Sequence, residues 1–174
     1  MKTARIFLII IFLGVCILLI LGLLAGIKQA GVLNSKIGIL PDFQFKTIEG
    51  KTFKSAEIRS GPVLLIYFNP DCEHCQFLID DLLKNIDYIK DSKVIMISNA
   101  DENTTVSFLK DRLNGNYNRI AVLVDDSLSF EDHFGKRKVP SVFIYNDELK
   151  LVKSFSGEVR SETLIKYLCN EYLH

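Results

Sequence analysis

The longest apolar run of the chain extends from Ile6 to Ile27 and contains no charged side chain. At about 1.5 Å per residue, a helix of this length reaches roughly 33 Å, enough to cross a bilayer core of about 30 Å. A buried helix of a soluble domain normally keeps a polar stripe, and this run has none. The pattern predicts a transmembrane anchor at residues 6–27, with a short tail at 1–5 and a juxtamembrane linker at 28–40.

Two processed forms are alternatives to an uncleaved anchor. A secretory signal requires small residues before its cleavage site; Ala30 supplies the last position, but Lys28 occupies the other small-residue position. A lipoprotein would carry its lipid on Cys16, but Val15 is a poor residue directly before a modified cysteine, and the apolar run continues beyond it. The uncleaved anchor is favoured, with Cys16 as an apolar filler.

The charges that flank the apolar run orient it only weakly. Lys2 and Arg5 precede the apolar run, whereas Lys28 and Lys36 follow it, so the excess of positive charge on either side is small. We expect the tail inside and the remaining domain outside, that is, a single-pass protein of the cell (inner) membrane with an extracytoplasmic, periplasmic C-terminal domain. The whole chain has 21 basic and 21 acidic side chains, which gives no indication of nucleic-acid binding.

From position 41 the hydrophobic pattern becomes that of a folded domain, residues 41–174. Short apolar runs of strand length alternate with segments of helical periodicity. Strands are predicted at 43–46, 52–54, 63–68, 94–97, 121–124, 141–145 and 151–155, with helices at 55–60, 71–90, 106–113, 130–134 and 161–173. The first part alternates strands with helices, and the end is an antiparallel hairpin followed by a helix. The fold class is therefore α/β, with a mixed central sheet flanked by helices on both faces.

The candidate chemistry lies in the sequence Cys72-Glu73-His74-Cys75, directly after the most apolar strand and at the start of a long helix. The unpaired N–H groups and the dipole at a helix N-terminus favour a thiolate at the first cysteine. The spacing places the second sulfur one turn further on, within reach of a disulfide. Cys72 is the predicted nucleophile and Cys75 the resolving thiol. His74 would support the thiolate and make the pair more oxidising, whereas Glu73 would oppose it.

Two unrelated buried thiols and half of a zinc site are the alternatives for such a pair, and a zinc site needs two further ligands. The other candidates are His74 itself, His133, Cys169 and His174, and none of these forms a second paired cluster. Cys169 is expected to be a core or half-buried thiol of the last helix. Redox chemistry is therefore favoured and no metal site is predicted. No nucleotide- or phosphate-binding loop is present in the sequence, so no organic cofactor is implied.

The chain resembles the thioredoxin-like superfamily, and within it the membrane-anchored TlpA-type (redoxin, AhpC/TSA-related) thiol–disulfide proteins. The residues that carry the resemblance are Pro41-Asp42-Phe43, Glu49-Gly50-Lys51-Thr52-Phe53, the segment from Tyr67 to Cys75, Val139-Pro140-Ser141 and Phe155-Ser156-Gly157. The resemblance covers about residues 41–173.

The resemblance implies that Val139-Pro140 is a cis peptide lying against the disulfide, with Val139 offering backbone bonds to an extended substrate. It also implies protein disulfide or dithiol substrates and a membrane or extracytoplasmic redox donor. The chain departs from the family pattern at the buried acid that many members place near the disulfide. Ile66 and Leu78 occupy those positions here, and the nearest acids, Asp80 and Asp81, come slightly later.

The leading hypothesis is a membrane-anchored thiol–disulfide oxidoreductase, acting as a reductase rather than an oxidase. A peroxiredoxin-type peroxide reductase is the first alternative, although Asn69 stands where that chemistry needs Thr or Ser. The second alternative is a non-enzymatic metal carrier or a tethered binding module.

Overall fold

The computed structural model describes residues 11–22, 37–59, 61–113, 119–135 and 138–169, and the chain divides into two units, Met1–Lys36 and Ile37–His174. In the first unit residues 11–22 are helical, and their large apolar side chains are exposed. The two ends of the predicted anchor, 6–10 and 23–27, lie outside the described residues, as do most residues of the predicted linker. Among the helices that are described, none combines the length and the apolar character needed to cross a membrane.

The second unit begins at Ile37, before the boundary that the hydrophobic pattern placed at position 41. Ile37 is buried, with 1% of its surface exposed. Residues 38–40 lie beside the residues that lead into the last strand. The Leu40 N–H donates to the Leu149 carbonyl (2.8 Å), and Ile39 forms an isolated β-bridge with Lys150. These contacts attach residues 37–40 to the domain.

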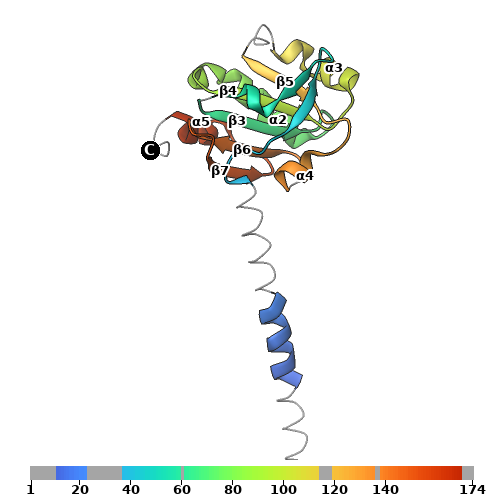
Figure 1. Ribbon diagram of the computed structural model, residues 1–174, viewed down its shortest axis with the longest axis vertical. Helices are drawn as coiled ribbons and strands as arrows, with labels where there is room; N and C mark the ends of the chain where they lie inside the picture. Colours follow the sequence, from blue (N-terminus) through green and yellow to red (C-terminus); the bar gives the residue numbers. More distant parts are fainter. Residues whose placement is uncertain (1–10, 23–36, 60, 114–118, 136–137, 170–174) are drawn as a thin grey trace, which may run out of the picture. The chain divides into compact units, whose positions relative to one another are not determined.

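Seven strands and their connecting helices make up the described part of this second unit (Figure 1). The strands are β1 (Gln44–Thr47), β2 (Thr52–Lys54), β3 (Val63–Phe68), β4 (Lys93–Ser98), β5 (Ile120–Val124), β6 (Ser141–Tyr145) and β7 (Leu151–Ser156). The helices are η1 (Ser55–Glu57), α2 (Glu73–Lys84), η2 (Ile86–Ile89), α3 (Glu102–Leu113), α4 (Phe130–Phe134) and α5 (Ser161–Cys169). The order of strands in the sheet is β2-β1-β5-β4-β3-β6-β7.

The sheet is mixed, as the sequence predicts. Strands β3, β4 and β5 are parallel neighbours, whereas β1, β2, β6 and β7 join them in antiparallel pairs. Parallel pairing requires a crossover, and α2 and α3 supply the two crossovers between β3, β4 and β5. The carboxyl ends of β3, β4 and β5 therefore meet at one edge of the sheet, from which the segment carrying Cys72 leaves.

Strand β3 forms the centre of the core because both of its faces are covered. All of its side chains are buried, which explains why its sequence is continuously apolar rather than alternating. Leu64, Ile66 and Phe68 pack with α2, α3 and α5 on one face. Val63, Leu65 and Tyr67 pack with α4 and the aromatic side chains of β1 and β2 on the other. Cys75 belongs to the first of these two clusters.

Three helices differ in extent from the periodicity-based prediction, and the first of them, predicted at 55–60, is the 3-10 helix η1, Ser55–Glu57. Helix α2 ends at Lys84, and the predicted continuation to residue 90 is a separate 3-10 turn, η2. Asn85 separates them, and its side-chain amide donates to the Asp81 carbonyl (3.0 Å). Helix α3 begins at Glu102 because the Asp101 carboxylate accepts the Thr104 N–H (2.9 Å), a capping interaction that hydrophobic periodicity alone does not reveal.

Candidate active site

Cys72 lies at the N-cap of α2, on the segment that follows β3. Asn69-Pro70-Asp71 ends the strand and turns the chain, and the Cys72 N–H donates to the Asn69 carbonyl (3.2 Å). The Cys72 carbonyl then accepts the N–H groups of Cys75 (2.9 Å) and Gln76 (3.0 Å), which closes the first turn of the helix. The Cys72 side chain is partly exposed and so remains accessible to another molecule.

Cys75 lies one turn further along α2, and its side chain is fully buried. Both cysteines are free thiols, and their side chains are hydrogen-bonded to each other. The two thiols therefore have different environments, one accessible at the helix start and one within the core. This asymmetry fits the division into a nucleophile and a resolving thiol.

Burial raises the pKa of the Cys75 thiol to about 12. A hydrogen bond with the backbone of Asn69 lowers this pKa, whereas the hydrogen bond with Cys72 and the negative charge of the Cys72 thiolate raise it further. Cys75 consequently stays protonated at neutral pH in the dithiol protein. It can attack only when its proton is removed during exchange.

Of the two residues between the cysteines, His74 has a partner from a distant segment. Its Nδ1 lies 2.7 Å from a carboxylate oxygen of Glu158, in the segment between β7 and α5. Glu73 is exposed in the first turn of α2. The effect of both residues on Cys72 stays a prediction, but any influence of His74 is exerted beside the Glu158 carboxylate.

Val139 and Pro140 come to the same edge of the sheet as the end of β3. Tyr67 of β3 pairs with Ser141 of β6 in an antiparallel register. Pro140 is therefore the next position opposite Phe68, close to the start of the segment 69–72 that carries Cys72. The Val139–Pro140 peptide bond is cis, as the resemblance implies. Val139 is partly exposed, whereas Pro140 is buried and its carbonyl accepts the Gly157 N–H (2.8 Å). The role of Val139 in substrate binding stays a prediction.

Among the described residues of the second unit, neither Cys169 nor His133 joins the pair. Cys169 is exposed rather than half-buried, and its thiol donates to the Tyr88 carbonyl (3.0 Å). The ring of His133 packs edge-on against Phe45. His174 lies outside the described residues. Across the part of the chain that the structure describes, no three His, Cys, Asp or Glu side chains gather as a metal site would require.

The two acids nearest to the motif are already bound to other groups. The Asp80 carboxylate accepts the Arg112 Nε–H (2.8 Å). The Asp81 carboxylate accepts the Ser161 N–H (2.7 Å) at the start of α5, and this bond holds the pKa of Asp81 below its usual value. Ile66 and Leu78, which occupy the usual positions of a buried acid, are both fully buried.

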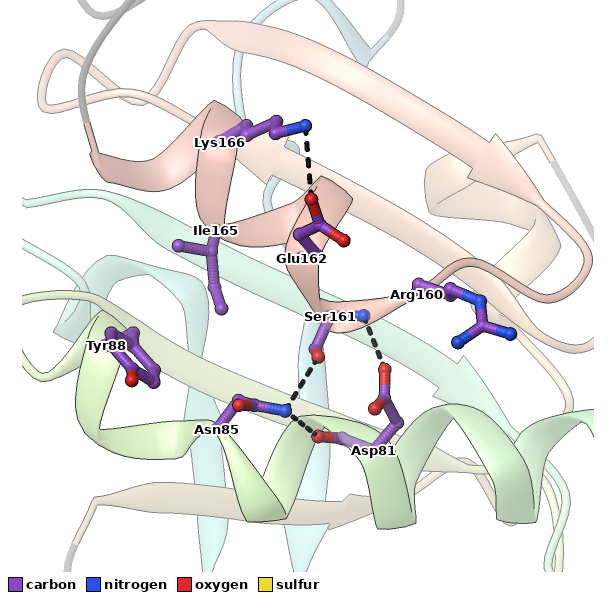
Figure 2. A pocket seen from close by; sticks show the side chains of 8 residues that line it. All are labelled: Asp81, Asn85, Tyr88, Arg160, Ser161, Glu162, Ile165 and Lys166. Carbon is purple, nitrogen blue, oxygen red and sulfur yellow. Dashed lines mark hydrogen bonds and ion pairs between the residues drawn. The ribbon is translucent and has the colours of Figure 1, made fainter.

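A cavity of about 550 Å³ lies between the end of α2 and α5 rather than at the cysteine pair (Figure 2). Asp81, Asn85 and Ser161 form a hydrogen-bonded row along its floor, and neither Cys72 nor Cys75 lines it. These bonds fasten α5 to α2.

Sequence reasoning did not identify Glu158 as a neighbour of the motif. Glu158 and His74 are separated by 84 positions, and neither lies in a pattern that would relate one to the other. The sequence feature nearest to this contact was Phe155-Ser156-Gly157, one of the segments that carry the family resemblance. Glu158 directly follows it and lies beside His74 in the first turn of α2.

Comparison with known proteins gives the family. Residues 38–154 match the AhpC/TSA family. The chain belongs to the AhpC/TSA family. A comparison with curated proteins found no match.

Solved structures show that the fold of this AhpC/TSA protein is thioredoxin-like. A secreted disulfide oxidoreductase of Mycobacterium tuberculosis, homologous to E. coli DsbE, is 15% identical with a TM-score of 0.64, over 78% of this chain and 97% of that one. The thioredoxin domain of a thiol-disulfide oxidoreductase from Bacteroides vulgatus is 15% identical with a TM-score of 0.60, over 76% and 96%. The exposed lipoprotein thioredoxin Etrx1 of Streptococcus pneumoniae is 22% identical with a TM-score of 0.57, over 73% and 97%.

The difference between the two thiols predicts selective alkylation. A thiolate is the reactive form, and the thiolate fraction of Cys75 rises only as the pH approaches its pKa of about 12. Iodoacetamide at pH 8 is therefore expected to modify Cys72 and to spare Cys75 in the folded, reduced protein. Mass spectrometry of tryptic peptide 60–84, which holds both cysteines, measures this directly. One adduct is expected when folded and two after denaturation; two adducts in the folded protein would contradict the assignment.

Proposed function

We propose that this AhpC/TSA protein is a membrane-anchored, extracytoplasmic thiol–disulfide oxidoreductase that reduces disulfides of partner proteins with the Cys72–Cys75 pair. The observation that carries the proposal is the arrangement of the two thiols. An accessible Cys72 at the start of α2 is hydrogen-bonded to a buried Cys75 one turn on. The names of two structural neighbours, each a disulfide oxidoreductase, support the same chemistry.

The reaction proceeds in two exchanges. The Cys72 thiolate attacks one sulfur of the partner's disulfide, which forms a mixed disulfide and releases the first partner thiolate. Cys75 then loses its proton and attacks Cys72 Sγ, which closes the Cys72–Cys75 disulfide and releases the second partner thiol. The partner gains two electrons and two protons, and the protein loses the same. A dithiol donor of the membrane or of the extracytoplasmic space restores the reduced pair.

The burial of Cys75 has a clear place in this sequence. A thiol that stays protonated cannot compete with Cys72 for the substrate, so the first attack comes from one defined sulfur. Once the mixed disulfide has formed, the Cys72 sulfur carries no charge that would oppose ionisation of Cys75. The charge contribution of Cys72 to the raised pKa of Cys75 is thereby removed at the step that needs the Cys75 thiolate.

The reduction potential of the Cys72–Cys75 pair tests the function. The full-length protein is equilibrated in glutathione or dithiothreitol buffers, and the dithiol fraction is read from peptide 60–84. A potential near about −270 mV, the thioredoxin value, is expected for a reductase. A potential near about −120 mV, the DsbA value, would contradict the reducing direction. The absence of any two-electron couple would contradict thiol–disulfide exchange itself, and peroxide consumption above background would favour the peroxiredoxin alternative.

The anchor rests on the apolar run at residues 6–27, of which residues 11–22 are helical with exposed apolar side chains, and its orientation rests on the basic residues that flank the run. We expect the full chain in the membrane fraction after alkaline carbonate extraction. In intact cells a membrane-impermeant maleimide is expected to label the partly exposed Cys72 of a Cys169→Ser variant, in which the exposed Cys169 is removed as a second site of labelling. A Cys72→Ser/Cys169→Ser variant gives the background. Release by carbonate would contradict the anchor, and protection until the cells are lysed would contradict the orientation.

A further inference from the structure

Two asparagines extend the pairing of β3 and β4 beyond the ends of these strands. The last register pair is Phe68 with Ser98, so Asn69 and Asn99 are the next residues on the two chains. The Asn99 N–H still donates to the Phe68 carbonyl (3.1 Å). Beyond this backbone bond the two segments are joined by their side chains: Asn69 Nδ2 donates to Asn99 Oδ1 at 2.7 Å. Both asparagines are partly buried.

Asn69 is linked to both halves of the redox motif. Its side-chain Oδ1 accepts the Asp71 N–H (2.7 Å), and its carbonyl accepts the Cys72 N–H (3.2 Å). Its backbone is also hydrogen-bonded with the Cys75 thiol. Asn69 thus holds the turn that carries Cys72, and Asn99 holds the amide of Asn69 from the neighbouring strand.

We infer that Asn99 is a positioning residue of the redox site, which fixes the Cys72 segment through Asn69 and thereby raises the effective concentration of the two thiols toward each other. The inference rests on the proposed function, because it concerns how readily the Cys72–Cys75 disulfide forms. Asn99 acts through Asn69 and has no described contact with either sulfur.

The physical argument compares the two redox states. In the disulfide state the bond between the sulfurs itself fixes the Cys72 segment relative to α2. In the dithiol state that restraint is absent, and hydrogen bonds such as the one between Asn69 and Asn99 hold the segment instead. A pair that is already held in place loses less conformational freedom when its ring closes, so its disulfide forms more favourably. Removal of the bond therefore stabilises the dithiol state relative to the disulfide.

Asn99→Ala tests this inference in the full-length protein equilibrated with reduced and oxidised glutathione. We expect the equilibrium constant for Cys72–Cys75 disulfide formation to fall three- to tenfold, and a tenfold fall corresponds to a potential about 30 mV more positive. Asn99→Asp keeps an acceptor oxygen for Asn69 and is expected to retain most of the wild-type constant. Asn103→Ala changes an exposed asparagine in the first turn of α3 and is the matched control, with no expected change.

A double-mutant comparison identifies the route of the effect. In an Asn69→Ala background, Asn99→Ala is expected to cause no further change, because the bond is already absent. A full additional effect in that background would overturn the inference. An equilibrium constant for disulfide formation within twofold of wild type in Asn99→Ala would also overturn the inference. This holds even if the variant were less stable in urea, because a purely structural role changes stability and not the redox equilibrium. If wild type itself formed no disulfide, the proposed function would fail; if wild type formed one and Asn99→Ala matched it, only this inference would fail.

Discussion

Cys75→Ser is expected to hold the protein on its substrates as a mixed disulfide, whereas Cys72→Ser is expected to lose exchange activity completely. The partly exposed Cys72 can still attack a partner disulfide when Cys75 is absent, but nothing resolves the adduct. Without Cys72 the remaining thiol is fully buried and protonated at neutral pH, so the first attack has no nucleophile.

Cys169→Ser is the matched control for these two variants. Cys169 is an exposed thiol of the same chain, at the end of α5, and its thiol is bonded to the Tyr88 carbonyl. We expect this variant to keep wild-type activity and to form no stable adduct. The measurement is a non-reducing gel of cells treated with acid to stop exchange, together with reduction of insulin disulfides by the purified full-length proteins. Wild-type activity in Cys72→Ser, or no adduct in Cys75→Ser, would contradict the assigned roles.

The sequence predicted the sheet well because buried parallel strands have an unmistakable composition. The strand at 63–68 agrees with the structure, and both of its faces are covered. The position of Cys72 followed from this strand, since a helix that begins just after a central strand places its first residue at the sheet edge. Residues 37–40 were harder, because they join the domain through an isolated bridge and a few backbone bonds that leave no periodic pattern.

The prediction that Cys169 is a core or half-buried thiol is wrong, because its side chain is exposed. The buried stripe of α5 consists of Ser161, Leu164 and Leu168. Cys169 follows the last of these and therefore turns about 100° away from the buried stripe. The sequence favoured burial of Cys169 because cysteine is usually among the most buried residue types. Apolar and polar residues are mixed at the end of this helix, so the pattern did not show that Cys169 lies off the buried stripe.

The contacts that position the active-site segment were beyond sequence reasoning for a different reason. Each joins side chains from separate elements: Asn69 to Asn99, and His74 to Glu158. A hydrogen bond between distant residues needs the register of the sheet and the path of the loops to be known first. A single sequence supplies the types of the residues but not their pairing.

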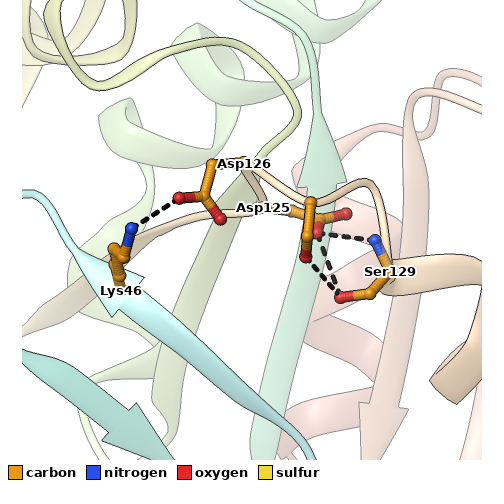
Figure 3. A network of polar contacts seen from close by, with 5 residues as sticks. Lys46, Asp125, Asp126 and Ser129 are labelled. Atoms are coloured by element: carbon orange, nitrogen blue, oxygen red, sulfur yellow. Dashed lines mark hydrogen bonds and ion pairs between the residues drawn. The ribbon is translucent and has the colours of Figure 1, made fainter.

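Asp125 also makes contacts that a single sequence does not reveal. Its substitution is expected to be among the most destabilising in the domain. It follows β5 directly, and its side chain is fully buried. One carboxylate oxygen accepts the Ser129 N–H (2.8 Å) and lies 3.3 Å from the Ser129 hydroxyl (Figure 3). The other accepts the Phe130 N–H (3.0 Å) and lies 3.4 Å from the Tyr67 hydroxyl. The carboxylate therefore joins the start of α4 to the central strand β3.

Asp125→Ala is expected to lower the free energy of unfolding by about 3–5 kcal/mol, because it removes the charged acceptor of the Ser129 and Phe130 N–H groups, and each hydrogen bond to a charged group contributes about 1.5–3 kcal/mol. That loss is a large share of the roughly 5–15 kcal/mol typical of a domain. Asp126→Ala is the matched control. The neighbouring carboxylate bonds Lys46 (2.6 Å) on the surface, with 53% of its side chain exposed, and such exposed ion pairs contribute little to stability. Urea unfolding of both variants, followed by circular dichroism, measures the difference. Equal losses in the two variants would contradict the expectation that the buried Asp125 carboxylate stabilises the fold more than the exposed Asp126 carboxylate, whereas a loss confined to Asp125→Ala would identify this carboxylate as the attachment of α4 to the sheet.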